Sequence, residues 1–278
     1  MSSVPAITLN NGVPMPQLGF GVWQIPDDEA ARAVGTALEA GYRSIDTAAV
    51  YENEKGTGQA LADSGIPRDE LFVTTKVWNS DQGYDATLRA FDASLERLGL
   101  DQVDLYLIHW PMPEVDRYVD TWKALQRIHE DGRARAIGVS NFHPEHLRRL
   151  IDETGTVPAV NQIELHPRLQ QPGPRSFHAE QGIATEAWSP LGQGKDLLQD
   201  PVLGEIARKH DRTVAQVVLR WHLQIGNVVI PKSVTPSRIR ENLDVFSFEL
   251  DGEDLRAVEA LNADSRLGPD PASMNWLG

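Results

Sequence analysis

Short apolar runs alternate with amphipathic segments from about residue 19 to residue 245 of this chain. Runs that are apolar on both faces are typical of strands buried in a parallel sheet. The pattern predicts eight strands, at residues 19–23, 43–46, 71–76, 103–109, 134–140, 159–163, 183–188 and 228–232. Because each run is followed by helical or loop sequence, the pattern favours the α/β class and a closed (β/α)8 TIM barrel.

Three amphipathic segments carry clear helix signals. Residues 27–40 begin with acidic side chains, keep their apolar positions on one face and stop at Gly41, which predicts a helix with a glycine at its C-terminal end. In residues 84–98 the apolar positions are spaced four, three, four and three, as on one helical face. Thr213 precedes a third such segment and is a suitable N-cap.

Both ends of the chain differ from this alternation. Residues 7–12 place an Asn-Gly turn between short apolar pieces, which predicts an N-terminal β-hairpin before the barrel. Residues 264–278 contain Gly268, Pro269 and Pro271 and predict a C-terminal loop. No linker, repeat or low-complexity tract interrupts the sequence, so we expect one domain over residues 1–278.

Composition narrows the possible functions. The 278 residues include 41% hydrophobic and 24% charged residues, as in ordinary globular proteins, and the net charge of -14 argues against binding to nucleic acid or to anionic membranes. The chain has no cysteine, which excludes disulfides and thiolate chemistry and is compatible with a reducing compartment. The N-terminus resembles no signal peptide and no run has transmembrane length, so we expect a cytoplasmic protein.

An acid, a phenol, an amine and an imidazole lie at or just past the ends of three successive predicted strands. They are Asp46, Tyr51, Lys76 and His109. The carboxyl ends of neighbouring parallel strands lie side by side, so these four groups are expected to converge at the mouth of the barrel. Each residue alone has an ordinary structural explanation, but together they suit the reduction of a carbonyl group.

Carbonyl reduction assigns one task to each of the four side chains. The hydride must come from a nicotinamide or flavin, because side chains cannot donate one. Tyr51 is the candidate proton donor, and the charge of Lys76 is expected to lower its pKa. Asp46 would keep Lys76 charged and His109 would place the substrate oxygen. No metal ligands accompany them.

Several long motifs resemble those of the aldo-keto reductase family, in the family's order over residues 6–262. They are DTAAVY (46–51) with Asn53 and Glu54, TKVW (75–78), DLYLIHWP (104–111), GVSNF (138–142), NQIE (161–164), SPLG (189–192) and IPKS (230–233). Within that family the chain looks most like the bacterial 2,5-diketo-D-gluconate reductases. The resemblance implies a (β/α)8 barrel, NADPH-dependent reduction of aldehydes and ketones to alcohols, and a catalytic tetrad of Asp46, Tyr51, Lys76 and His109.

The chain has no Gly-x-Gly-x-x-Gly motif, and the resemblance instead implies NADP(H) extended across the barrel mouth. Lys232, Ser233 and Arg238 follow the eighth strand, near a helix expected to begin at Ser237, and suit a 2′-phosphate. Asn141 would bind the carboxamide or cap a helix, or do both. The expected cofactor residues are Val22, Trp23, Asp46, Ser140, Asn141, Gln162, Trp188, Ser189, Leu191, Gln193, Gly194, Lys232, Ser233, Val234, Arg238, Glu241 and Asn242.

Aromatic residues that follow the strands predict an apolar substrate pocket. The expected substrate-binding residues are Trp23, Tyr51, Trp78, His109, Trp110 and Trp276. Because the tail is short, we expect a permissive pocket for small carbonyl compounds, with keto sugar acids such as 2,5-diketo-D-gluconate as one option. The resemblance implies a monomer, and we expect a small-molecule carbonyl substrate and neither a nucleic-acid nor a membrane partner.

Two other functions fit parts of the pattern. A barrel lyase could use Lys76 as a Schiff base, but that leaves Tyr51, Lys232 and Arg238 unexplained as a set. A non-catalytic subunit that binds or senses nicotinamide nucleotides would be expected to have a damaged tetrad or large insertions, and the sequence has neither.

Overall fold

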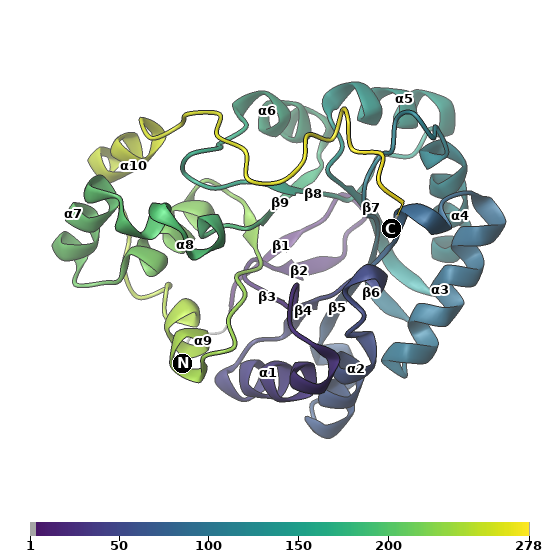
Figure 1. Cartoon of the computed structure of the whole chain (residues 1–278), viewed down its shortest axis with the longest axis horizontal. Helices are drawn as coiled ribbons and strands as arrows, with labels where there is room; N and C mark the ends of the chain where they lie inside the picture. Colours follow the sequence, from purple (N-terminus) through teal and green to yellow (C-terminus); the bar gives the residue numbers. More distant parts are fainter. Residues whose placement is uncertain (1–3, 278) are drawn as a thin grey trace.

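The computed structural model describes residues 4–277 and contains a sheet of eight parallel strands in the order β10-β9-β8-β7-β6-β5-β4-β3. Figure 1 looks along the barrel that this sheet forms, with helices around its outside. The strands are β3 (Phe20–Gly21), β4 (Ser44–Asp46), β5 (Phe72–Val77), β6 (Val103–Ile108), β7 (Ala134–Ser140), β8 (Val160–Glu164), β9 (Ala184–Trp188) and β10 (Val228–Val229). The predicted (β/α)8 barrel is therefore confirmed.

The first and last strands close the barrel through a few hydrogen bonds. Gly19 N donates to Val229 O (2.8 Å) and Gly21 N donates to Pro231 O (3.2 Å). Both strands are only two residues long, so the predicted strands 19–23 and 228–232 are too long. Pro231 has no N–H group and cannot continue the ladder, which explains why β10 ends before it.

In the part of the chain that the structure describes, ten α-helices surround the strands. They are α1 (Asp27–Ala40), α2 (Glu54–Asp63), α3 (Tyr84–Leu98), α4 (Tyr118–Glu130), α5 (Pro144–Thr154), α6 (Pro172–Gln181), α7 (Pro201–His210), α8 (Val214–Gln224), α9 (Pro236–Leu243) and α10 (Gly252–Glu259). The three helices expected from the sequence are present. Gly41 ends α1 in the left-handed conformation (φ 117°), and Thr213 caps α8 through a hydrogen bond from Gln216 N (3.3 Å).

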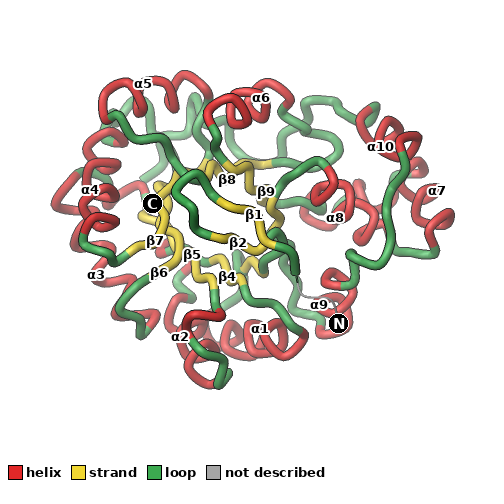
Figure 2. Tube along the Cα trace, turned by 180° about the vertical axis from the view of Figure 1, so that it is seen from behind, coloured by secondary structure: helices red, strands yellow, loops and turns green. Residues whose placement is uncertain are grey.

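The predicted N-terminal hairpin closes one end of the barrel. Its strands β1 (Ala6–Thr8) and β2 (Pro14–Pro16) pair antiparallel, and Figure 2 shows them lying across the opening. Leu9 and Met15 are buried against apolar residues of the barrel interior. Asn10 Nδ2 donates to Pro158 O (3.0 Å), which ties the turn to the barrel. The predicted C-terminal loop crosses the opposite end of the barrel (Figure 1).

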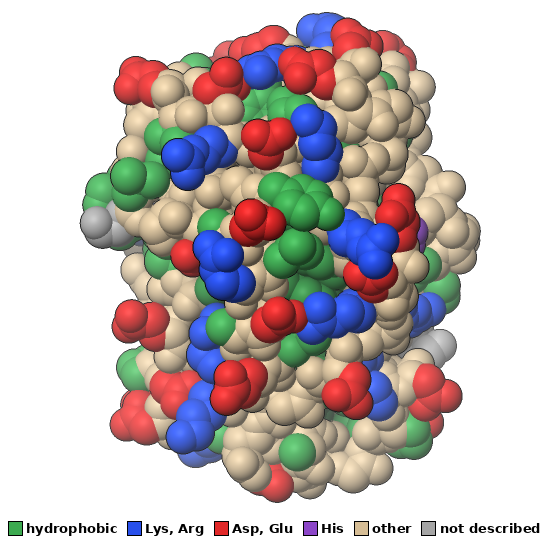
Figure 3. Space-filling view, turned by 90° about the vertical axis from the view of Figure 1, so that its right-hand side faces the viewer, with side chains coloured by type: hydrophobic (Ala, Val, Ile, Leu, Met, Phe, Trp, Pro, Cys, Tyr) green, Lys and Arg blue, Asp and Glu red, His purple; other side chains and the backbone are tan. Residues whose placement is uncertain are grey.

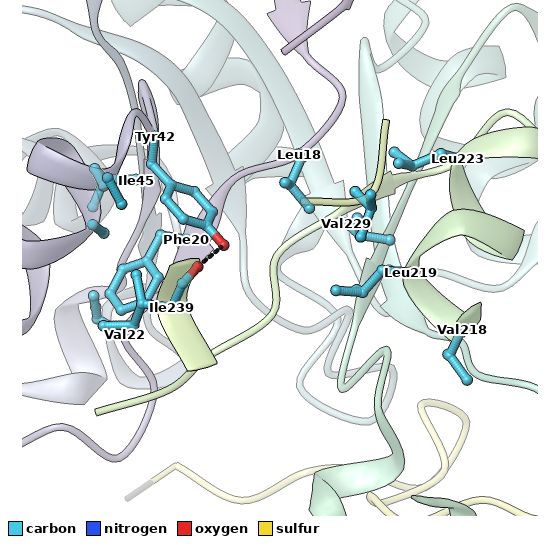
Figure 4. Packing of buried hydrophobic residues seen from close by; sticks show 14 of the residues in the cluster. Leu18, Phe20, Val22, Tyr42, Ile45, Val218, Leu219, Leu223, Val229 and Ile239 are labelled. Atoms are coloured by element: carbon cyan, nitrogen blue, oxygen red, sulfur yellow. Dashed lines mark hydrogen bonds between the residues drawn. The ribbon is translucent and has the colours of Figure 1, made fainter. Parts of the chain in front are cut away.

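A large apolar layer packs the helices onto the outside of the strands. Figure 4 shows part of it, where Phe20, Tyr42 and Ile45 lie beside Ile239 of α9. The Tyr42 hydroxyl donates to Ile239 O (3.1 Å), and burial raises the pKa of this phenol. This contact holds α9, which follows the eighth strand, against the start of the barrel.

The outer side formed by α3 and α4 is charged but mixed in sign. Figure 3 shows acidic and basic side chains distributed around a narrow apolar strip on this side. Ion pairs such as Arg133 with Asp92 (2.6 Å) and Arg127 with Asp131 (2.8 Å) contribute to the mixture. This side therefore carries no continuous basic surface. Among the described residues, no helix is both long and apolar enough to span a membrane.

Replacing Tyr42 by phenylalanine tests the contact between α9 and the barrel. Tyr42→Phe removes the hydroxyl that donates to the buried Ile239 carbonyl, so the free energy of unfolding should fall by about 1–2 kcal/mol. Urea denaturation measures this change. Tyr84→Phe, which alters an exposed tyrosine, is the control and should change stability by less than about 0.5 kcal/mol. Equal effects of the two substitutions would contradict the assignment.

Candidate active site at the barrel mouth

The structure brings the four predicted catalytic side chains to the same end of the barrel. Asp46 ends β4, Lys76 is the next-to-last residue of β5, and His109 directly follows β6. Tyr51 ends a short 3-10 helix, Ala49–Tyr51, in the loop after β4. The four groups come from the carboxyl ends of neighbouring strands, as the sequence predicted.

Lys76 and Asp46 form an ion pair inside the barrel. Lys76 Nζ donates to Asp46 Oδ1 (2.7 Å) and to Thr47 O (2.9 Å), and the lysine side chain is fully buried. Burial by itself lowers the pKa of Lys76, but the charges of Asp46 and Tyr51 reverse this, and the net direction is upward. Lys76 is thus a fixed ammonium group and not a free amine.

Tyr51 lies beside this ammonium and is partly accessible to solvent. Lys76 Nζ is 5.1 Å from the centroid of the Tyr51 ring. Desolvation raises the pKa of Tyr51 and Lys76 lowers it, with a net direction upward. The expectation of a lowered pKa is therefore wrong for the net direction. Lys76 acts in the expected sense, but burial outweighs it.

The loop that carries Tyr51 is held by a residue that sequence reasoning did not single out. Asn53 is buried, accepts a hydrogen bond from Thr47 Oγ1 (2.8 Å), and donates to Val22 O and Ile25 O (both 2.9 Å). Asn53 occurs in a recognised motif, but the two carbonyl groups to which it donates lie 31 and 28 residues earlier in the chain. Only the fold reveals that it joins the loops after β3 and β4.

His109 is neutral and faces aromatic neighbours. Its ring lies edge-on to Tyr51 (centroid distance 5.7 Å) and to Trp78 (5.1 Å). Burial and the charge of Lys76 hold the pKa of His109 well below its usual range. Its Nδ1 is enclosed without a hydrogen-bond partner among the described residues. A neutral imidazole can donate one hydrogen bond, which suits a carbonyl oxygen.

Three predicted cofactor-binding residues, Ser140, Asn141 and Gln162, lie together next to the tetrad. Ser140 Oγ donates to Gln162 O (2.8 Å), and Asn141 Nδ2 donates to Ser140 Oγ (3.1 Å) and His109 O (3.0 Å). Asn141 does not cap the following helix, because the N-cap of α5 is His143. Asn141 Oδ1 instead accepts from Trp188 Nε1 (2.8 Å), which fixes the edge of that indole.

Glu186 is a buried acid inside the barrel that was not predicted as a site residue. It accepts a hydrogen bond from Gln162 Nε2 (2.8 Å), and the same nitrogen donates to Asp46 Oδ2 (2.8 Å). Burial and the nearby Asp46 raise the pKa of Glu186 to about 8. An acid in an otherwise apolar strand was the signal available in the sequence. Its contact with Gln162 depends on the pairing of β8 with β9.

The predicted phosphate-binding residues lie at the start of α9. This helix begins at Pro236, one residue before the expected Ser237. Lys232 and Arg238 are exposed, Ser233 is half-buried and Val234 is exposed. Within residues 4–277 neither cation forms an ion pair, in contrast to Arg220 with Glu249. Two available cations at a helix N-terminus fit an additional phosphate group.

Other predicted cofactor residues are arranged around the same face. Gln193 and Gly194 are exposed and have positive φ values (58° and 69°), as does Ser189 (49°), while Leu191 is half-buried. Glu241 accepts from Thr213 Oγ1 (2.7 Å), and Asn242 is buried. Val22 is enclosed, with its N–H bonded to Asp46 O (3.1 Å).

The predicted aromatic residues and the C-terminal loop surround the mouth. Trp78, Trp110 and Met112 form a buried cluster, against which Trp188 and Met274 pack. Trp276 lies 5.5 Å from Trp78 between ring centroids and remains 59% exposed. Trp23 is also exposed, at 43%. Beside the tetrad, the mouth is thus mainly apolar.

Glu164 anchors the C-terminal loop and was also missed as a functional residue. Its buried carboxylate accepts hydrogen bonds from Leu267 N (2.6 Å) and Gly268 N (2.9 Å). Hydrogen bonds from His166 and from these amides hold the pKa of Glu164 below its usual value, against the effect of burial. Further along, Trp78 Nε1 donates to Leu277 O (2.9 Å). The loop is attached on both sides of the mouth.

Comparisons with known proteins agree with this arrangement. The model of the aldo/keto reductase family matches residues 17–263. An aldo-keto reductase of Mycolicibacterium smegmatis is 62% identical, covering 99% of each chain. The methylglyoxal reductase DkgA of Yersinia pestis is 54% identical over 98% of each chain. A crystal structure of a Gox0644 mutant in complex with NADPH has a TM-score of 0.95 and 52% identity, covering 99% of this chain and 100% of that one.

The raised pKa of Glu186 predicts a specific pH dependence of stability. In the unfolded chain this acid ionises near its ordinary pKa, whereas the folded chain keeps the proton up to about pH 8. The contribution of protonated Glu186 to the free energy of unfolding is fully present below the pKa that this acid has in the unfolded chain. It is lost as the pH rises through the pKa that it has in the folded chain. Glu186→Gln removes this titration.

Between pH 5 and pH 9, the wild type should therefore lose on the order of 2–4 kcal/mol more stability than Glu186→Gln does. Urea denaturation at pH 5, 7 and 9 measures the difference. Thr185→Val, a substitution of the neighbouring residue on β9 that does not titrate, should leave the wild-type pH dependence in place. Parallel pH profiles of wild type and Glu186→Gln would show that this acid is ionised throughout.

Proposed function

The chain belongs to the aldo/keto reductase family, and we propose that it reduces small, uncharged aldehydes and ketones to alcohols with Tyr51 as the proton donor. It is an oxidoreductase that acts on carbonyl groups and uses NADP(H). The observation that carries the proposal is the cluster of Tyr51, the Lys76–Asp46 ion pair and a neutral His109 at the mouth.

The four side chains have complementary roles in this mechanism. NADPH, when bound, supplies the hydride to the carbonyl carbon. Tyr51 donates its proton to the carbonyl oxygen, and the ammonium of Lys76 stabilises the phenolate that remains. Asp46 holds Lys76 charged and in place through the 2.7 Å contact. Neutral His109 donates a hydrogen bond to the same oxygen and orients the carbonyl group.

The residues around the mouth fit NADP(H) in chemistry as well as in place. Ser140, Asn141 and Gln162 supply the short polar groups that an amide requires, and Trp188 supplies a flat apolar surface. Lys232, Ser233 and Arg238 would hold the 2′-phosphate at the start of α9. Gln193 and Gly194 would cover the pyrophosphate from their exposed loop.

The lining of the mouth supports a small and uncharged substrate. Trp78, Trp110 and Met112 form an apolar wall beside His109, and the anchored loop places Trp276 over Trp78. Such a wall favours apolar bodies and excludes water from the reacting carbonyl. Methylglyoxal, named for one similar protein, is a suitable first substrate, and 2,5-diketo-D-gluconate is the charged alternative.

The environment of Lys76 does not favour a barrel lyase. A Schiff base requires a free amine, but this ammonium is buried, has a raised pKa and donates to Asp46 and Thr47. Borohydride trapping with a carbonyl substrate should therefore leave Lys76 unlabelled.

The proposal is tested by steady-state assays of NADPH and NADH oxidation with methylglyoxal, other small aldehydes and 2,5-diketo-D-gluconate. Uncharged dicarbonyls should give the highest kcat/KM with NADPH. A clear preference for the keto acid would reject the substrate class while leaving the reductase chemistry intact. Absence of turnover with any carbonyl compound, combined with tight NADPH binding, would instead favour the sensing alternative.

Substituting Tyr51 tests the identity of the proton donor. Tyr51→Phe retains the ring beside His109 and Lys76 but removes the acidic hydroxyl, so kcat for carbonyl reduction should fall by at least roughly 100-fold. The dissociation constant of NADPH, measured by tryptophan fluorescence, should change by less than about threefold. Turnover near the wild-type rate would assign the proton transfer to another group.

Substituting Arg238 tests the location of the 2′-phosphate. A lost charge-assisted hydrogen bond of about 1.5–3 kcal/mol should raise the Michaelis constant for NADPH roughly 10- to 100-fold in Arg238→Gln, with little effect on NADH. Added salt should weaken NADPH binding more in the wild type than in the variant. Arg240→Gln, on the same helix, is the matched control. Equal effects on both cofactors would mean that the phosphate is bound elsewhere.

A further inference from the structure

One buried acid, Glu186, has no part in the mechanism described above. It lies on β9, where it is the register partner of Gln162 on β8, and it is 1% exposed. The groups that face it across the barrel are Asp46 and Lys76, with Tyr51 beside them. A carboxyl group placed within the barrel is costly to bury, so its contact with Gln162 calls for an explanation.

The amide of Gln162 is held by two acceptors at once. Its Nε2 donates to Asp46 Oδ2 and to Glu186 Oε2, both at 2.8 Å. An amide NH2 group has two hydrogens, so both are used by these two carboxyl groups. Turning the amide over would withdraw both N–H groups from their acceptors and place its carbonyl oxygen against the carboxylate of Asp46, which has no hydrogen to donate. Glu186 and Asp46 together therefore select one orientation.

This orientation leaves the carbonyl oxygen of Gln162 available. Among residues 4–277, Gln162 Oε1 accepts no hydrogen bond, and it is absent from the fully enclosed polar atoms that lack a partner. The oxygen therefore keeps some accessible surface, although Gln162 as a whole is 2% exposed, and the main-chain carbonyl of the same residue accepts a hydrogen bond from Ser140 Oγ. It is an acceptor only, so it matches a ligand that offers an N–H group.

We propose that Glu186 is a positioning residue that orients Gln162 to accept a hydrogen bond from the NH2 group of the nicotinamide carboxamide. The inference rests on the proposed function, because it takes the nicotinamide to lie at this mouth. Either protonation state of Glu186 has an oxygen that accepts from Gln162, so the role depends on the reach of the side chain and not on its charge. The raised pKa means that Lys76 and Asp46 are not joined by a second anion at neutral pH.

Two conservative variants of Glu186 test separately the length of its side chain and its ability to ionise. Glu186→Asp keeps the acid but is one methylene shorter, which withdraws the acceptor from Gln162. Glu186→Gln keeps the length and an acceptor oxygen but removes the acid. Thr185→Val on the same strand is the control, because Thr185 bonds to His178 and not to Gln162. Circular dichroism and thermal melts establish that each variant is folded.

The readout is binding, measured by quenching of tryptophan fluorescence, of NADP+ and of its 3-acetylpyridine analogue, whose acetyl group has no NH2. The wild type should bind the analogue about tenfold more weakly, the equivalent of about 1.4 kcal/mol for one hydrogen bond. In Glu186→Asp the ratio of the two dissociation constants, that of the analogue divided by that of NADP+, should fall to about 1–3. In Glu186→Gln and Thr185→Val it should remain within threefold of the wild-type ratio.

The possible failures are distinct. A wild-type ratio near 1, an unchanged ratio in Glu186→Asp, or an equal loss in Glu186→Gln and Glu186→Asp overturns the positioning role while the reductase function stands. If the wild type binds neither NADPH nor NADP+, the proposed function fails and this inference fails with it.

Discussion

The buried ion pair of Lys76 and Asp46 is the constraint on which the site depends. Removing an ammonium and a carboxylate from water costs several kcal/mol per ion, so each must be satisfied by close partners. Thr47 O and Gln162 Nε2 complete the coordination of the pair. The barrel interior is therefore apolar next to the hairpin and charged next to the mouth. This polarity along the barrel places a fixed positive charge beside Tyr51 and keeps His109 neutral.

The two ends of the chain have opposite roles around that charged layer. The hairpin uses Leu9 and Met15 to extend the apolar interior and close the barrel. The C-terminal loop covers the other end, with its amides on Glu164 and its Leu277 carbonyl on Trp78. Because both anchors of the loop lie at the mouth, substrate access and the geometry of the aromatic wall depend on the same few hydrogen bonds.

Different parts of the fold and site were predictable to different degrees. Strand β7 and helix α1 were predicted to the residue, because periodicity and a terminal glycine are local signals. Strands β3 and β10 were predicted too long, because their ends depend on how the barrel closes at Pro231. The convergence of the tetrad followed from strand order and direction. The pKa of Tyr51 did not, because the balance between burial and Lys76 is a property of the packed site.

The sequence by itself determined the barrel class, the family resemblance and the side chains available at each strand end, because these follow from periodicity and from motifs within short segments. Tertiary structure alone decided which polar groups share a partner. Asn53 joins two loops, Glu164 holds a loop about a hundred residues away, and Glu186 meets Asp46 through Gln162. Such contacts span distant segments and depend on strand register and burial, which set the hydrogen bonds and the charge state of each group.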